Sequence, residues 1–152
     1  MNITPLRPHH IIDIVTQHGQ NSQFKPHPYG HAVHTVAKNI LNNINVAVKL
    51  IIEADEICQP CIHLLPSGQC DDILQKIDPP IPKQKYNDSI DSKLLSYLNI
   101  PPDSILTIKE YLESINSKIP GIEEICTHPK ENMENRLEGL IEGLIRIGIR
   151  RK

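Results

Sequence analysis

The chain has 152 residues and a formal net charge of −2 at pH 7, a size that suits one compact domain. Hydrophobic residues make up 39% of the chain and charged residues 22%, which predicts a buried core and argues against a disordered protein. Aromatic residues make up only 3%, and together with the small net charge this argues against binding to nucleic acid or to an anionic membrane.

The first third of the chain predicts two helices and a strand. Prolines and glycines interrupt residues 1–30, where an apolar run over residues 11–15 predicts a short helix. Apolar residues at helical spacing then predict an amphipathic helix over residues 31–44. Alternating side chains with apolar residues on both faces predict a largely buried strand over residues 46–53.

A loop rich in cysteine and proline follows the predicted strand. It covers residues 54–78, and its prolines and glycine exclude long regular structure. A short helix is expected near its end, over residues 71–77. Residues 78–86 contain three prolines and are expected to form a surface connector.

The remaining residues predict three helices. Asp88 is expected to cap the first, which has to end before Pro101. Thr107 and Glu110 have the spacing of a capping box at the start of the second. The third is expected to start near Pro129. Its apolar stripe, with two glycines that suit close packing, consists of Leu137, Gly139, Leu140, Ile141, Gly143, Leu144 and Ile145.

These elements predict a mainly helical α+β fold with a small sheet, formed by a single domain over residues 1–152. Its C-terminal helical part covers residues 88–150, and the cysteine loop is expected to lie against the last helix. No apolar run is long enough for a transmembrane helix, and the N-terminal residues lack the apolar core of a secretory signal. We therefore expect a cytoplasmic protein.

The cysteines indicate a metal centre. Disulfides are rare in the cytoplasm, which favours metal binding or thiol chemistry for all four. Three follow the pattern Cys58-x2-Cys61-x8-Cys70, in which two thiolates converge because the short backbone between them turns. Pro60 and Gly68 suit a chain that bends tightly around such a centre. Thiolate ligands select zinc, copper(I) or an iron–sulfur cluster.

Three cysteines leave a fourth ligand open. The candidates are Cys126, His63, His9 and His10. We favour Cys126, because it is the last thiolate and stands just before a predicted helix start, where free N–H groups favour negative charge. Adjacent histidines on a helix point about 100° apart, so at most one of His9 and His10 is expected to be a ligand. The alternative for each of these residues is burial without a metal.

Two other polar groups are expected to be solvated rather than functional. The first is a set of histidines at helical spacing, His27, His31 and His34. The second is the acidic run before the first cysteine, Glu53, Asp55 and Glu56.

Three stretches together resemble the domain-of-unknown-function family 1284, small prokaryotic proteins thought to bind an iron–sulfur cluster. The first is Leu6-Arg7-Pro8-His9-His10, and the second runs from Asp55-Glu56-Ile57-Cys58-Gln59-Pro60-Cys61 to Gly68-Gln69-Cys70. The third is a leucine-rich helix and turn, from Leu94 to Pro101 and on through Thr107–Leu112. The resemblance implies a cluster and no particular reaction.

The chain departs from the family pattern at two positions. The family has a cysteine shortly after the double histidine, where this chain has Asp13. A second Cys-x2-Cys pair would align with Cys126 and Pro129, so only its first cysteine is present. The resemblance therefore implies one four-cysteine cluster and argues against a second.

Our leading hypothesis is a protein that holds a [4Fe–4S] cluster through Cys58, Cys61, Cys70 and Cys126, with His9 or His10 as alternative fourth ligands. Such a cluster would serve electron transfer, or chemistry on an unidentified protein partner. The first alternative is a zinc-stabilised interaction module without a redox role. The second is a thiol enzyme that uses Cys58 and Cys61.

Overall fold

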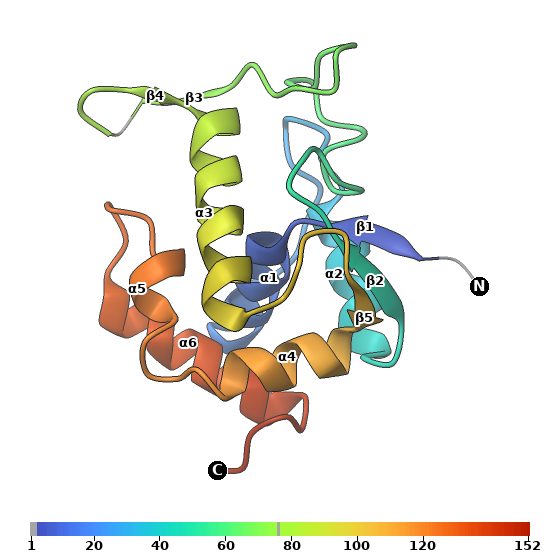
Figure 1. Ribbon diagram of the computed structural model, residues 1–152, viewed down its shortest axis with the longest axis vertical. Coiled ribbons are helices and arrows are strands. Elements are labelled where there is room, and N and C mark those ends of the chain that lie inside the picture. Colours follow the sequence, from blue (N-terminus) through green and yellow to red (C-terminus); the bar gives the residue numbers. More distant parts are fainter. Residues whose placement is uncertain (1–2, 76) are drawn as a thin grey trace.

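The computed structural model describes residues 3–75 and 77–152, and it begins with a strand that leads straight into a helix (Figure 1). Strand β1 covers Thr4–Leu6 and helix α1 covers Pro8–Gly19. The helix is longer than the run predicted over residues 11–15, because Pro8 occupies a first-turn position where its missing N–H costs nothing. The apolar run that predicted the helix is buried in the core.

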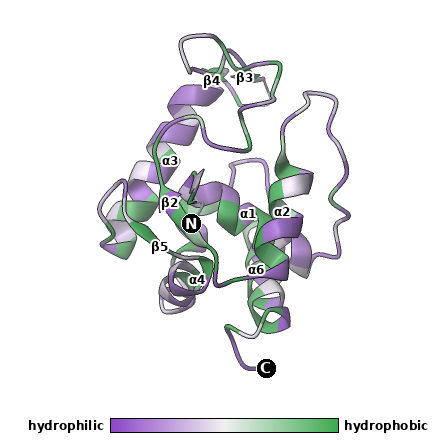
Figure 2. Cartoon of the chain, turned by 90° about the vertical axis from the view of Figure 1, so that its right-hand side faces the viewer, coloured by the Kyte–Doolittle hydropathy of each residue, from purple (hydrophilic) through white to green (hydrophobic). Residues whose placement is uncertain are grey.

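The next two elements confirm the predicted helix and strand with tighter bounds. Helix α2 covers Val33–Asn42, and strand β2 covers Ala47–Leu50. Helix α2 contains both hydrophobic and hydrophilic residues, shown in green and purple in Figure 2, as expected of an amphipathic helix. Val48 and Leu50 are fully buried, which agrees with the expected burial of the strand.

Strand β2 is the centre of a three-stranded mixed sheet. It pairs in parallel with β1, with Thr4 opposite Val48, and antiparallel with β5, which covers Ile105–Thr107. Because β1 and β2 are parallel, their carboxyl ends lie at the same edge of the sheet. The chain that leaves β1 therefore meets the cysteine loop that leaves β2. Backbone hydrogen bonds from Ile51 N to Leu6 O and from Glu56 N to Pro5 O, each 3.1 Å, hold the two together.

Two expectations between the sheet and the second half are wrong. Instead of a helix over residues 71–77, the structure has β3 over Ile73–Leu74, paired antiparallel with β4 over Ile81–Pro82; residue 76 lies outside the described residues. A strand of two residues is too short to show an alternation of apolar and polar side chains, so the sequence pattern cannot predict it. Its pairing depends on contacts made in the folded protein.

The connector expected over residues 78–86 is also shorter than predicted, because helix α3 covers Lys83–Leu98. Pro82 is the N-cap residue and the helix starts at Lys83, so Asp88 lies inside the helix rather than at its cap. Its end is as predicted: Asn99 takes a left-handed conformation with φ 57° just before Ile100 and Pro101.

The C-terminal helices confirm one cap and correct another. Helix α4 covers Ile108–Asn116 and opens with the predicted capping box of Thr107 and Glu110. After the short helix α5, Glu123–Cys126, the last helix α6 covers Met133–Arg146. It starts later than Pro129 because Asn132 is its cap, accepting a 2.9 Å hydrogen bond from the Asn135 amide.

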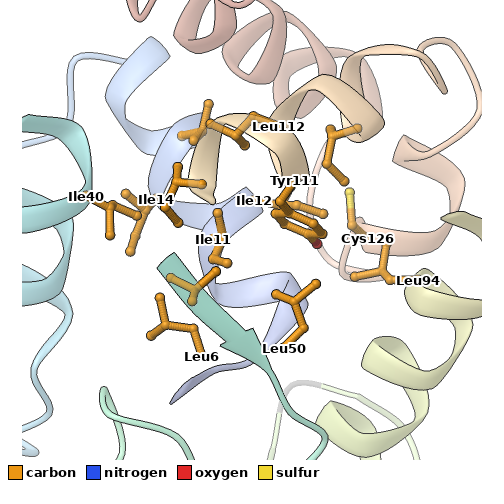
Figure 3. Close-up of a cluster of buried hydrophobic side chains, with 14 of the residues drawn as sticks. Leu6, Ile11, Ile12, Ile14, Ile40, Leu50, Leu94, Tyr111, Leu112 and Cys126 are labelled. Atoms are coloured by element: carbon orange, nitrogen blue, oxygen red, sulfur yellow. The ribbon is translucent and has the colours of Figure 1, made fainter. Parts of the chain in front are cut away.

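Helix α1 lies at the centre of the hydrophobic core (Figure 3). One of its faces packs against α6, and there the two glycines of the last helix allow the backbones to approach closely, as predicted. An added Cβ at Gly143 would overlap the carbonyl oxygen of Val15, and one at Gly139 would lie 3.0 Å from that of Thr16. Only glycine fits this contact.

The architecture confirms the α+β class, with six helices and a small mixed sheet among the described residues. Among the described residues, no helix combines the length and the apolar character that a bilayer crossing demands. The expected position of the cysteine loop is wrong. The loop packs against the start of α1 and α3 at the sheet edge, and α6 lies elsewhere (Figure 1).

Candidate metal centre

The three loop cysteines line one partly enclosed cavity of about 60 Å³. All three are half-buried and carry free thiols. Because a single water needs about 10 to 15 Å³ of such space, the cavity has room for a group several times larger. Ala54 and Leu64 of the loop also line it, and residues at the starts of α1, α2 and α3 complete its wall: Arg7, His10, His31, Lys83, Gln84 and Asn87.

Successive turns of backbone carry the first two cysteines. The Cys58 amide donates to Asp55 O at 3.0 Å, the Cys61 amide to Cys58 O at 2.9 Å, and the Leu64 amide to Cys61 O at 3.1 Å. Pro60 lies exposed within this run. The tight bend predicted around the Cys-x2-Cys pair is therefore present.

Cys70 reaches the cavity from the far end of the loop. An isolated bridge pairs it with Leu64, and its amide donates to Gln84 Oε1 of α3 at 2.8 Å. The Asp72 amide lies 3.4 Å from the Cys70 sulfur and donates to it. An N–H that points at a sulfur stabilises negative charge there, which suits a thiolate ligand.

Asp55 is a central residue of the site, and the expectation that it is solvated is wrong. Only 1% of it is exposed, whereas Glu53 and Glu56 are exposed as expected. Its Oδ2 accepts from the Arg7 amide at 2.7 Å, and its Oδ1 accepts from the amides of Ile57 and Cys58 at 3.1 and 3.3 Å. A carboxylate with this many partners can be buried without a large penalty.

His10 forms an ion pair with Asp55, with Nδ1 2.7 Å from Oδ2. Burial opposes charge on both groups, but each partner's charge and hydrogen bond outweigh it. The pKa of His10 is raised, and that of Asp55 is lowered to about 2. A carboxylate behind an imidazole also fixes the direction of the ring, as it does for histidines at metal sites.

A candidate metal-binding group combines this pair with the first cysteine. The ligand atoms of His10, Asp55 and Cys58 all lie within 4.8 Å of one another. Burial and the negative charge of Asp55 raise the pKa of the Cys58 thiol to about 12, although Arg7 acts in the opposite direction. The free thiol is therefore protonated at neutral pH, and a bound cation is needed to make it a thiolate. This argues against Cys58 as the nucleophile of a thiol enzyme.

A buried ion network fixes the start of α1 against α3. Arg7 is 1% exposed and donates to Asp91 Oδ2 at 2.9 Å and to Asp88 Oδ1 at 2.8 Å. The other oxygen of Asp91 accepts from the His9 amide at 2.9 Å, with His9 Nδ1 at 2.8 Å. No sequence pattern indicated Asp91, because its partners lie more than 80 positions away.

The adjacent histidines face different cavities, in agreement with their expected divergence. His10 lines the cavity of the loop cysteines, and His9 lines a second cavity of about 170 Å³. Cys126 and Asp13 line that second cavity too. The structure thus brings three of the four cysteines together with His10, and it places Cys126 and His9 apart from them.

Cys126 behaves as a core residue in this structure. It is 5% exposed and belongs to the same hydrophobic cluster as Tyr111 and Leu94 (Figure 3). Burial raises the pKa of its thiol, with a partial offset from Arg136, which forms an ion pair with Asp13. The prediction that Cys126 is the fourth ligand has no support in this geometry, and the variants proposed below test it.

His31 is a residue that sequence reasoning missed. It was expected to be solvated, but its ring is half-buried and lines the cysteine cavity. Burial and the neighbouring His27 lower its pKa, so the ring is neutral at pH 7. His63, another candidate ligand, is instead paired with Asp71 at 2.8 Å and does not line the cavity.

The family model of DUF1284, described as a protein of unknown function, matches residues 27–130. This is more than half of the chain, so the chain belongs to that family. The matched region contains all four cysteines, Asp55 and His31, whereas Arg7 and His10 precede it. No curated protein and no solved structure matches the chain.

Proposed function

We propose that this chain binds an iron–sulfur cluster of the [4Fe–4S] type through Cys58, Cys61 and Cys70. The observation that carries the proposal is the convergence of these three thiols on one cavity, at the edge where two parallel strands end. Sets of thiolates select iron–sulfur clusters, zinc or copper(I) over hard cations. A donor set of three cysteines fits the first two groups best.

The dimensions of the site favour a cluster over a single zinc ion. Zinc–sulfur bonds of about 2.3 Å require thiolates that nearly touch one another. Within residues 3–75 and 77–152, the three cysteine sulfurs do not form a set within 4.8 Å of one another. The cavity of about 60 Å³ also exceeds what a single ion needs. Thiolates around a cluster stand farther apart, because each binds a different iron.

The runner-up is a zinc-stabilised interaction module, and the compact group of His10, Asp55 and Cys58 is the observation that favours it. In this group, however, both oxygens of Asp55 already accept hydrogen bonds from the described residues. His10 in turn directs Nδ1 at that carboxylate, which orients the ring and leaves Nε2 available to a metal. We therefore assign Asp55 to supporting the centre rather than to binding zinc.

The cavity wall carries both charges. Each positive side chain that lines it is paired with a carboxylate: Arg7 with Asp88 and Asp91, His10 with Asp55, and Lys83 with Asp72. The Asp72 amide also donates to the Cys70 sulfur. When bound, a cluster of this type supplies one-electron chemistry. Beside the cysteines, Ile62 is 70% exposed and Leu65 41% exposed, an apolar rim through which we propose that a protein partner reaches the centre.

The test is anaerobic purification of the wild-type chain, followed by measurement of iron, acid-labile sulfide and zinc per chain. We expect a brown protein with iron and sulfide in near-equal amounts. Replacing Cys58, Cys61 or Cys70 by serine should remove most of both. Cys126→Ser is the matched control, because it removes a buried thiol outside the cavity, and it should keep its cluster.

Two results would contradict the proposal, and a third would change its set of ligands. A colourless protein with one equivalent of zinc and no sulfide would support the interaction module instead. Full iron content in each of the three loop variants would show that the cluster is held elsewhere. Loss of the cluster in Cys126→Ser, at unchanged stability of the fold, would restore Cys126 as the fourth ligand.

A further inference from the structure

His31 occupies a position in the cysteine cavity that no ligand pattern in the sequence predicted. Its ring lines the cavity, although it stands 27 positions before Cys58 in the chain. Its Nδ1 is covered by protein atoms and has no hydrogen-bond partner among the described residues. A metal in the cavity would therefore bind the ring through its other nitrogen, Nε2.

The backbone around His31 is fixed to the Cys-x2-Cys turn on both sides. The Ala32 amide donates to Ile57 O, just before the first cysteine, at 2.9 Å. Tyr29 O accepts from the Ile62 amide, just after the second, at 2.7 Å. His31 lies between these two hydrogen bonds, so it cannot leave the turn without breaking them.

A glycine makes this approach possible. Gly30 has a φ of +76°, and a Cβ added there would lie 3.0 Å from the carbonyl oxygen of Pro60, which stands between the two cysteines. The ring of His31 is in addition stacked on that of His27, with centroids 4.3 Å apart and planes at 22°. Backbone and ring are thus both held in place before any metal is bound.

We propose that His31 is the fourth protein ligand of the centre and completes a Cys3His set with Cys58, Cys61 and Cys70. This inference rests on the proposed cluster. Among the other candidates, His63 is paired with Asp71, and His9 and Cys126 line a separate cavity. His10 lines the cysteine cavity as well, so it is the rival that the experiment has to exclude. A neutral imidazole in place of a thiolate also makes the centre less negative, which raises the reduction potential.

The experiment measures nitrogen bound to the reduced cluster by pulsed electron paramagnetic resonance, in protein labelled with nitrogen-15 histidine. The wild type should show a strong coupling from one directly bound imidazole. His31→Ala should lose it. His31→Cys should keep full iron, lose the coupling and have a lower reduction potential, and it guards against a variant that merely fails to fold.

His34→Ala is the matched control. His34 also has a buried Nδ1 without a partner among the described residues, but it does not line the cavity, so the coupling should persist. Coupling retained in His31→Ala, or lost only in His10→Ala, overturns the assignment of His31 and leaves the cluster proposal intact. A wild-type protein without iron and sulfide overturns both.

Discussion

His10 Nδ1 lies 2.7 Å from Asp55 Oδ2, so the first helix and the cysteine loop meet through a charged pair that is nearly closed to water. Asp55 loses its contribution to stability as the pH falls from 3.8 through its lowered pKa of about 2. His10 contributes fully below 6.5 and loses its contribution as the pH rises through its raised pKa. The pair therefore stabilises the fold most between these limits.

The first prediction concerns Asp55→Asn in the metal-free protein. Between pH 3.8 and 6.5, the variant should lose about 3 to 5 kcal/mol of unfolding free energy, because the buried His10 then has to hold an unpaired charge or give up its proton. The difference from the wild type should shrink at higher pH, where His10 is neutral. Denaturant unfolding at a series of pH values measures this.

Asp71→Asn is the control for that experiment. It breaks the pair of His63 and Asp71, whose side chains are 26% and 49% exposed, and should cost less than about 1 kcal/mol. If the loss in Asp55→Asn does not depend on pH, the charge on His10 does not explain it.

The second prediction concerns removal of the metal. The cysteine loop, residues 54–78, lies largely at the surface. Hydrogen bonds tie it to the fold at separate points, among them Asp55, Ile57, Ile62 and Cys70. A bound centre would join its two ends, so loss of the centre should lower the melting temperature and speed proteolysis within the loop. Limited proteolysis with mass spectrometry locates the cuts. Equal cutting with and without the centre would contradict this prediction.

The third prediction concerns the contact between α1 and α6. Gly143→Ala should destabilise the fold by about 1 to 3 kcal/mol, because the new methyl group overlaps the Val15 carbonyl and forces the helices apart. Thermal unfolding measures the change. Glu138→Ala, at an exposed position of the same helix, should have little effect. Equal stability of the two variants would mean that the helices are not in close contact.

The helices could be predicted because their signals are local. Apolar residues at helical spacing predicted α2. Thr107 and Glu110, which are three residues apart, predicted the start of α4. The start of α3 was missed because its first turns are polar and follow a run of prolines, which indicates a connector when read alone. Pairing of β3 with β4 involves two residues on each side, too few to leave a pattern.

The residues of the candidate site also fall into those that a local sequence pattern predicted and those that depend on tertiary contacts. The spacing of Cys58, Cys61 and Cys70 is a local pattern, and it predicted their convergence. The roles of Asp55 and His31 depend on contacts between segments that are far apart in sequence, above all on the parallel pairing of β1 with β2. One signal for Asp55 was available: it follows the strand that leads into the cysteine motif, at an edge where ligands commonly bind.

The glycine contact between α1 and α6 has a consequence for the time at which the centre is able to form. Every residue that lines the cysteine cavity lies between Arg7 and Asn87, so all of them leave the ribosome well before α6 does. Yet α1, which follows Arg7 and carries His10, gains its partner on the opposite face only when Gly139 and Gly143 arrive. We therefore expect cofactor insertion to follow synthesis of the last helix, so that a chain truncated before α6 keeps each lining residue but fails to retain the cofactor.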